Sequence, residues 1–333
     1  VRLDKDKRKN LLFSIPQKEL YRLIKSTFYA VTQDEIRPTL TGLNISKNKV
    51  AGLDGYRLAI SESEEFDTDA SITLSAPTVK VLLKLLDKKS TDAVSFYITK
   101  KQDFVIIEID KILVTAHLLD GAYIKYESII PDDYKYEIQI DAKELLKKLK
   151  FMFKLTVSTQ EIVKLTMDPS KLYIENSNST STIRDSIKIN VVEHEELPFK
   201  IAFTPLYLRD ALKKYKDIVT MQFSTRVSPA VIKSGNNLDL VLPVRILKEW
   251  KKLASKVALV KFRGYQEFME YSYFTDIEDL KEGDVVVVPV NNFYSIGVFS
   301  RYSSNKQHVK NASKCIVEKV DIESFEEKMF LGL

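Results

Sequence analysis

Apolar residues recur at helical spacing in four segments of the chain, with lysine or arginine on the opposite side of each. The pattern predicts helices that begin near Gln17, Pro77, Asp141 and Pro205, at steps of 60, 64 and 64 residues. Residues three and four apart share one face of a helix, so each helix has one face for a core and one basic face. A fixed period indicates one structural unit used four times. The apolar positions are Leu20, Leu23, Ile24 and Phe28; Val79, Leu82, Leu83 and Leu86; Leu145, Leu146, Leu149 and Phe153; and Leu208, Ala211, Leu212 and Tyr215.

Short alternating runs between these helices predict β-strands. One run precedes each helix, as at 12–15, and three or four runs follow it. Two such units make one domain with helices and sheets in a common core. The sequence therefore predicts an α+β fold with domains at residues 11–131 and 132–246, after a polar lead at 1–10.

The period ends after Ile246. Residues 247–256 have the pattern of a short basic helix or linker around Trp250, the only tryptophan. Five short apolar runs within 258–320 then predict a small β-barrel or a half-open sheet. We therefore expect a separate, mostly β domain at 247–333, and its residues do not indicate a role.

Positive charge is concentrated on the predicted helices. The segments 17–29, 77–89, 142–154 and 205–216 together carry a formal charge of +12, against +5 for the whole chain, so the remaining residues carry −7. A single lysine-striped helix is commonly just a solvated face. Four at a regular period, beside an acidic remainder, favour a polyanion such as nucleic acid as the partner. The candidate DNA-backbone contacts are Lys18, Arg22, Lys25, Lys80, Lys84, Lys88, Lys143, Lys147, Lys150, Lys154, Arg209, Lys213 and Lys216.

Cysteine usage and hydropathy bear on the cellular compartment. Cys315 is the only cysteine, which excludes an intrachain disulfide framework and fits a reducing cytoplasm. No apolar run approaches the roughly 20 residues that span a bilayer. Residues 1–10 are polar and charged, so we expect no signal peptide. The expectation is a cytoplasmic protein without a membrane partner.

The residues that carry enzyme chemistry are scattered. The three histidines are far apart in the sequence, and Cys315 has no neighbour that would complete a triad or a zinc site. The nine glycines form no phosphate-binding loop. The acidic stretch at 62–69 matches no metal-ligand spacing and is typical of a solvated connection. We therefore expect no metal, no cofactor and no catalytic residues.

Three groups of motifs carry a family resemblance, and they occur in order within the repeat. The motifs are GLDGYRLA at 52–59 after RPTLTG at 37–42, LLDG at 118–121 with IIP at 129–131, and VLPVRI at 241–246 after VSPAVI at 227–232. On these motifs the chain resembles the bacterial replicative sliding clamp, the beta subunit of DNA polymerase III, over about residues 11–246, which would correspond to its second and third domains.

This resemblance implies a ring of six similar domains that encircles duplex DNA and tethers a polymerase without chemistry of its own. Helices would line the hole and meet phosphates through lysine and arginine, whatever the DNA sequence. The DNA polymerase and the clamp loader would bind through short peptides in an apolar pocket between the two domains. The implied pocket residues are Leu40, Leu53, Gly55, Tyr56, Arg57, Leu58, Ile124, Ile129, Val227, Pro229, Leu240, Leu242, Val244 and Arg245.

The chain also departs from the family pattern. Tyr56 stands where the family usually has histidine, and Ile124 replaces a common proline. The family's first domain has no counterpart before Leu11, and some 87 residues follow Ile246. The implied homo-oligomer is a trimer if two clamp domains complete a subunit, and a dimer if an N-terminal domain is missing. The alternatives are an adaptor that binds partner peptides without encircling DNA, and an enzyme carried by the C-terminal domain.

Overall fold

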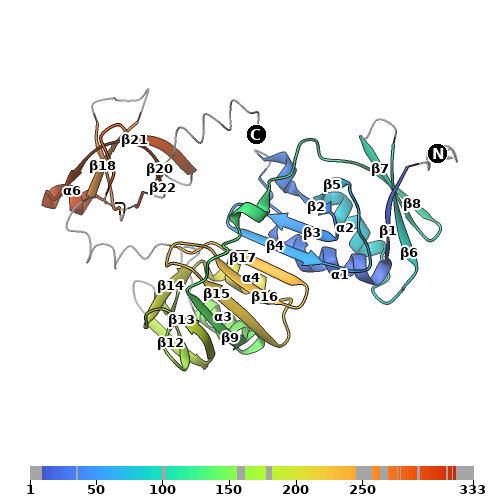
Figure 1. Ribbon diagram of the computed structural model, residues 1–333, viewed down its shortest axis with the longest axis horizontal. Coiled ribbons are helices and arrows are strands. Elements are labelled where there is room, and N and C mark those ends of the chain that lie inside the picture. Colours follow the sequence, from blue (N-terminus) through green and yellow to red (C-terminus); the bar gives the residue numbers. More distant parts are fainter. Residues whose placement is uncertain are drawn as a thin grey trace. The chain divides into compact units, whose positions relative to one another are not determined.

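The computed structural model separates into two compact units, which divide between Val244 and Arg245 (Figure 1). The described residues are 10–34, 37–99, 103–155, 162–177, 182–244, 257–262, 269–275, 277, 279–290, 293–312, 314–316 and 318–319. Within these residues, no helix is long and apolar enough to cross a membrane.

The first unit consists of one motif, strand–helix–three strands, used four times. The first copy contains β1 (Leu11–Pro16), α1 (Gln17–Thr27), β2 (Gly42–Ser46), β3 (Lys49–Leu53) and β4 (Arg57–Glu62), and the second contains β5 (Ser71–Ser75), α2 (Ala76–Leu85), β6 (Ala93–Ile98), β7 (Phe104–Ile109) and β8 (Ile112–His117). The third copy contains β9 (Tyr136–Asp141), α3 (Ala142–Leu155), β10 (Val163–Met167), β11 (Lys171–Ser177) and β12 (Thr182–Lys188). The fourth copy contains β14 (Phe199–Phe203), α4 (Pro205–Leu212), β15 (Ile218–Phe223), β16 (Ala230–Ser234) and β17 (Asn237–Val241). The extra strand β13 (Asn190–His194) follows the third copy, and the 3-10 turns are η2 (Phe28–Ala30), η3 (Pro38–Thr41) and η4 (Tyr126–Ile129). The predicted fourfold repeat is confirmed.

Two helices end earlier than the sequence predicts. After α2, Leu86 is extended, and the side chain of Asp87 accepts a hydrogen bond from the backbone N–H of Lys89. Such local hydrogen bonds compete with helix propagation. Lys88 therefore lies in a turn beyond α2, and Lys216 lies beyond the end of α4.

Each copy of the motif gives its first strand to the neighbouring copy. β1 joins β6–β7–β8, and in return β5 joins β2–β3–β4. In the second half of the unit, β14 joins β10–β11–β12, and β9 joins β15–β16–β17. Two consecutive copies therefore share both of their sheets, and each helix pair packs into the core between them: α1 beside α2, and α3 beside α4.

Pairing between β4 and β17 joins the two halves into one nine-stranded sheet, β13-β9-β15-β16-β17-β4-β3-β2-β5 (Figure 1). Leu58 lies opposite Leu240, and Ala59 lies opposite Asp239. Successive residues of a strand face opposite sides of the sheet. The leucines face a small apolar cluster, whereas Asp239 contacts residues that directly follow α1 and α4. All four helices therefore pack on one face of the sheet.

The second unit is a five-stranded antiparallel sheet of order β19-β18-β21-β20-β22. Its elements are β18 (Val257–Lys261), β19 (Tyr271–Tyr273), β20 (Val285–Val290), β21 (Phe293–Ser303), α6 (Lys306–Asn311) and β22 (Glu318–Lys319). The strand order leaves β19 and β22 at the edges, as in the half-open alternative of the prediction. Helix α6 was not predicted, although Asn305 caps it by accepting a hydrogen bond from Gln307 N–H. The predicted helix or linker at 247–256 lies outside the described residues.

Candidate nucleic-acid and peptide-binding sites

The four helices bury most of their apolar stripes and expose lysine, but Phe153, predicted to face the core, is 40% exposed near the end of α3. In α1, for example, Leu20, Leu23 and Ile24 are buried in the core while Lys25 is exposed. Nine of the thirteen predicted DNA contacts are exposed lysines that form no ion pair with any described residue. They are Lys25, Lys80, Lys84, Lys88, Lys143, Lys147, Lys150, Lys154 and Lys216.

The other four predicted contacts have acidic neighbours. Arg22 binds Glu19 at 2.5 Å and also donates to the carbonyl oxygen of Glu62, which fixes it against β4. Lys213 and Arg209 both lie near Asp210, at 2.6 and 3.4 Å. The remaining pair joins Lys18 to Glu65 at 4.0 Å. Because exposed ion pairs contribute little energy, an incoming phosphate can replace such an acid as the partner of Lys18 or Lys213.

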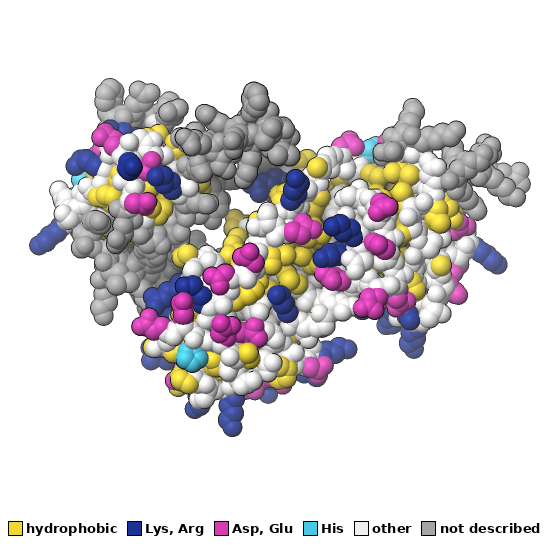
Figure 2. Space-filling model, viewed as in Figure 1, with side chains coloured by type: hydrophobic (Ala, Val, Ile, Leu, Met, Phe, Trp, Pro, Cys, Tyr) yellow, Lys and Arg dark blue, Asp and Glu magenta, His cyan; other side chains and the backbone are white. Residues whose placement is uncertain are grey.

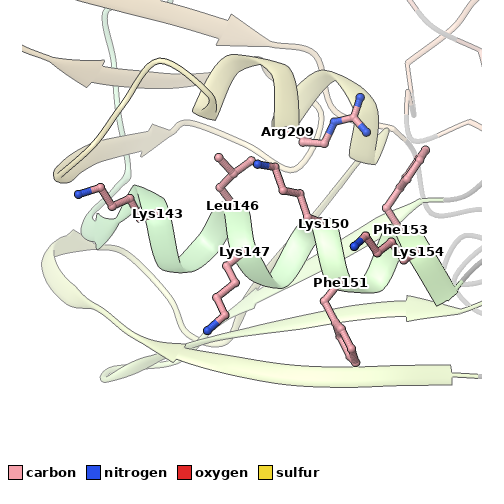
Figure 3. A pocket seen from close by; sticks show the side chains of 8 residues that line it. All are labelled: Lys143, Leu146, Lys147, Lys150, Phe151, Phe153, Lys154 and Arg209. Carbon is pink, nitrogen blue, oxygen red and sulfur yellow. The ribbon is translucent and has the colours of Figure 1, made fainter.

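A groove of about 630 Å³ runs along α3 (Figure 3). Five cationic and three apolar side chains line it, and Arg209 reaches it from α4. The guanidinium of Arg209 lies 5.0 Å from the centre of the Phe153 ring. The complete lining is Lys143, Leu146, Lys147, Lys150, Phe151, Phe153, Lys154 and Arg209. Four of the predicted DNA contacts on α3 and one on α4 therefore form a single surface.

Some of the predicted pocket residues do come together where β4 meets β17. Leu40, Leu53, Leu58 and Leu240 are buried in one cluster, here called the junction cluster, although they come from both halves of the unit. Its other members are Ala51, Ile60 and Tyr126. These four leucines are core residues, so only their outer surface is available as the floor of a pocket.

The rim of the predicted pocket is exposed and largely apolar. Tyr56, Ile124, Ile129 and Val227 are each about two-fifths exposed, at 43, 41, 40 and 38%. Figure 2 shows hydrophobic side chains gathered over the region where β4 and β17 adjoin. The N–H of Leu242 donates to the carbonyl oxygen of Tyr56 at 2.9 Å, which ties the rim across the junction.

The remaining predicted pocket residues differ in how well they are placed. Pro229 and Leu242 are half-buried at the same end of the β16–β17 ladder, where Ala230 pairs with Val241. Val244 is half-buried and donates its N–H to the carbonyl oxygen of Ala202. Gly55 is exposed with a φ of 86°, a conformation that favours glycine. Arg245 lies outside the described residues.

The structure gives Arg57 a role different from the predicted polar contact in the pocket. Its side chain is 11% exposed and binds both Asp54 and Asp210 at 2.9 Å. Its guanidinium also lies 5.2 and 4.9 Å from the ring centres of Tyr29 and Tyr207. The reason is strand alternation: Leu58 faces the junction cluster, so its neighbour Arg57 faces the helices.

A buried polar cluster between the halves was missed by the sequence analysis. Asp239 is fully buried and accepts hydrogen bonds from the hydroxyls of Tyr29 and Tyr215. The Nζ of Lys214 lies 2.9 Å from Asp239 and also donates to the carbonyl oxygen of Ser26. Ser26 and Tyr29 belong to the first half, and the other three residues belong to the second. We call these five residues the Asp239 cluster.

Burial dominates the electrostatics of this cluster. Burial raises the pKa of Asp239 and lowers the pKa of Lys214, because a low-dielectric interior disfavours the charged form of each group. Burial and the negative charge of Asp239 raise the pKa of both Tyr29 and Tyr215, so these hydroxyls remain donors. These hydrogen bonds and the ion pair connect the two halves of the first unit, and we call this connection a structural joint.

The described residues contain no group of three or more histidine, cysteine or acidic side chains that could hold a metal ion. The chemistry available at both candidate sites is binding: cations for phosphates along the helices, and apolar surface for aliphatic or aromatic side chains at the junction.

Comparison with known proteins identifies the family. Residues 14–125 match the model of the DNA polymerase III beta subunit, central domain, and residues 127–245 match that of its C-terminal domain. The beta sliding clamp of Bacillus subtilis is 31% identical over 245 residues, which are 69% of this chain and 64% of that protein. That of Rickettsia bellii is 28% identical over 253 residues, covering 70% of this chain and 66% of that protein. The chain thus spans just under two thirds of these relatives.

Solved structures agree with this assignment. The B. subtilis sliding clamp superposes with a TM-score of 0.64 at 27% identity, over 74% of this chain and 67% of that one. A putative DNA polymerase III beta subunit from Eubacterium rectale shares the fold, with a TM-score of 0.67 at 20% identity over 74% of this chain and 68% of that one. The chain therefore belongs to the DNA polymerase III beta-subunit family, and residues 14–245 form the central and C-terminal domains of that family.

Proposed function

We propose that this chain is a DNA sliding clamp, a non-catalytic processivity factor that encircles duplex DNA. The observation that carries the proposal is a set of nine exposed lysines, without an ion pair among the described residues, on or directly after four helices that pack on one face of a continuous sheet. Cations on such a surface contact phosphates and do not read base edges. Binding would therefore be independent of DNA sequence and strongly dependent on salt.

The proposed ring is a homo-oligomer of this chain. Two clamp domains at 11–131 and 132–246 in each chain would close a six-domain ring as a trimer, and a further clamp domain would make it a dimer. The domain at 247–333 would lie outside this repeat. The mass of the full chain in solution separates these cases: a trimer supports two domains per subunit, whereas a monomer at all concentrations contradicts a closed ring.

Retention on closed circular DNA tests encirclement directly. A clamp loaded on a closed circle should remain bound at high salt and leave when the circle is cut, because its hold is topological. Equal release from the closed and cut forms would refute the proposal.

The double variant Lys147→Ala/Lys150→Ala should load less well, while the control Lys111→Ala/Lys188→Ala removes the same charge from exposed positions outside the helices.

We further propose that a polymerase and a clamp loader bind through short peptides at the junction between β4 and β17. The support is an exposed apolar rim over a rigid buried floor, which suits aliphatic and aromatic anchors. Ile124→Ser and Val227→Ser should weaken the binding of a short peptide with such anchors in fluorescence anisotropy. Ile112→Ser is the matched control, since Ile112 is 45% exposed on β8. Unchanged peptide affinity in both rim variants would remove this site from the proposal.

The proposed location follows from these partners. A protein that encircles chromosomal DNA and binds a replicative polymerase would be cytoplasmic and associated with the nucleoid. Imaging of a fluorescent fusion during replication would show foci on the nucleoid, and an even distribution throughout replicating cells would contradict this location.

A further inference from the structure

Helix α3 differs from the other three helices in exposing aromatic side chains. Phe151 is 58% exposed and Phe153 is 40% exposed. Along the described residues of α1, α2 and α4, the exposed large apolar side chains are aliphatic: Val81 on α2 and Leu206 on α4. Contact with the phosphates of a duplex requires cations only, so the two phenylalanines need a separate explanation.

The two rings flank the helix on opposite sides. Each residue turns an α-helix by about 100°, so side chains two positions apart project in nearly opposite directions. Phe153 lies on the side toward α4, where Arg209 covers one face of its ring (Figure 3). Phe151 points to the other side, as does Lys147 one turn earlier in the helix (Figure 3). Phe153 therefore has a cation on its ring, and Phe151 shares its side of the helix with Lys147.

The charge of the groove selects among possible occupants. Five of its eight lining residues are cationic, and none is acidic. The Nε of Arg209 is buried without a hydrogen-bond partner among the described atoms, and besides the Phe153 ring its guanidinium reaches only Asp210, at a long 3.4 Å, among those atoms. A purely apolar peptide would leave these cations without counter-charges. A polyanion with flat apolar groups satisfies both the cations and the rings.

We propose that the α3 groove binds unpaired bases of single-stranded DNA, with the base rings stacked on Phe151 and Phe153 and the phosphates on the lysines. Base stacking on aromatic side chains together with a cationic groove is the general basis of sequence-tolerant single-strand binding. In a duplex the bases are stacked on one another, so the phenylalanine faces discriminate between single-stranded and duplex DNA. The proposal rests on the proposed function, because it assigns α3 to the surface that faces DNA.

The test compares three ligands on the full chain by fluorescence anisotropy: an oligothymidylate, an abasic strand of equal length and a duplex. Phe151→Ala and Phe153→Ala should each weaken oligothymidylate binding at least about fivefold, the effect of losing one stacked base. Affinity for the abasic strand and for the duplex should stay within about twofold, and the salt dependence should not change, because no charge is removed. Phe104→Ala is the control, since Phe104 is 36% exposed on β7.

Conservative variants separate stacking from damage to the helix. Phe151→Tyr and Phe153→Tyr retain a flat ring and should retain oligothymidylate affinity. Unchanged affinity in the alanine variants would overturn the proposal, as would an equal loss on all three ligands or a loss in the tyrosine variants. A groove that serves a protein partner or a second copy of the chain would give the first of these results. Retention on circular duplex is measured separately, so either proposal can fail while the other holds.

Discussion

Removing one charge from the Asp239 cluster should loosen the joint between the two halves of the first unit. Asp239→Asn keeps the shape of the side chain but leaves the ammonium of Lys214 buried without its counter-charge. With an effective dielectric constant of about 20, Coulomb's law gives about 6 kcal/mol of attraction at the 2.9 Å separation of this pair, before desolvation is subtracted. Breaking a buried pair by removing one partner costs about 3–5 kcal/mol. We expect a loss of unfolding free energy in that range.

The double variant Asp239→Asn/Lys214→Met decides whether charge pairing is the reason. It removes both charges and leaves two neutral side chains, and such replacements are often close to neutral. The cost of the double variant should therefore be at least about 2 kcal/mol smaller than the sum of the single costs, within the range of coupling between residues in contact. If the single costs add, the two residues are not coupled and the reasoning is refuted.

Urea unfolding followed by circular dichroism measures these costs, with the m-value compared across the four proteins because a chain of several domains need not unfold in one step. Hydrogen exchange at the amide of Leu240 adds a local readout, since β17 pairs with β4 beside the cluster. Exchange at this amide should accelerate in both single variants. Unchanged exchange, together with a lower midpoint, would place the damage elsewhere.

Three further predictions concern the helices, the junction cluster and low pH. Lys147→Ala/Lys150→Ala should weaken duplex binding for every DNA sequence and lower the slope of log affinity against log salt by about 2, as measured by titration. Leu240→Ala should cost about 2–5 kcal/mol in urea unfolding, because Leu240 is 2% exposed. Burial alone would raise the pKa of Asp210, but Lys213 and Arg57 hold it below its usual value. The stability it contributes is complete above the unfolded pKa of about 3.9 and is lost as pH falls through the lower folded value, so Asp210→Asn should flatten the acid limb of a pH–stability curve.

Two of these predictions have a matched control, and the third has an outcome that would contradict it. Leu206→Ala on α4 removes a 38% exposed leucine and should change stability little. Lys111→Ala/Lys188→Ala should leave the salt slope unchanged. An acid limb of the same steepness in Asp210→Asn would show that other carboxyl groups carry the acid sensitivity.

The helices and strands were predictable because their signals are local. An apolar stripe of period 3.6, as in α1, and alternation of period 2, as in β6, depend only on nearby residues. The exchange of first strands was not predictable in this way. Which strand pairs with β1 is decided by contacts across some 80 residues, where Leu11–Pro16 meets Ala93–Ile98.

Strand alternation explains why Arg57 is placed differently from Leu58. Both were assigned to one predicted pocket, although neighbours in a strand face opposite sides of a sheet, and Arg57 binds Asp210 on α4 while Leu58 is buried in the junction cluster. The same rule did not identify Asp239, which alternates with Leu238 and Leu240 in β17. From sequence alone this alternation predicts a solvent-facing aspartate, because the residues that bury it, such as Tyr29 and Lys214, are distant from it in the chain or on another element.

Arginine and lysine on the helices make different kinds of contact, and the chemistry of the two side chains explains the difference. Both predicted arginines are engaged with the protein, Arg22 with Glu19 and Arg209 with the ring of Phe153, whereas the nine predicted contacts that lack an ion pair within the described part of the chain are all lysines. Arginine binds phosphate through a fixed fork of donors, but the lysine ammonium is a hydrated point charge on a flexible stem. A surface whose free cations are lysines can exchange one phosphate for the next without a preferred register. This property distinguishes a surface that slides along DNA from one that stops at a site.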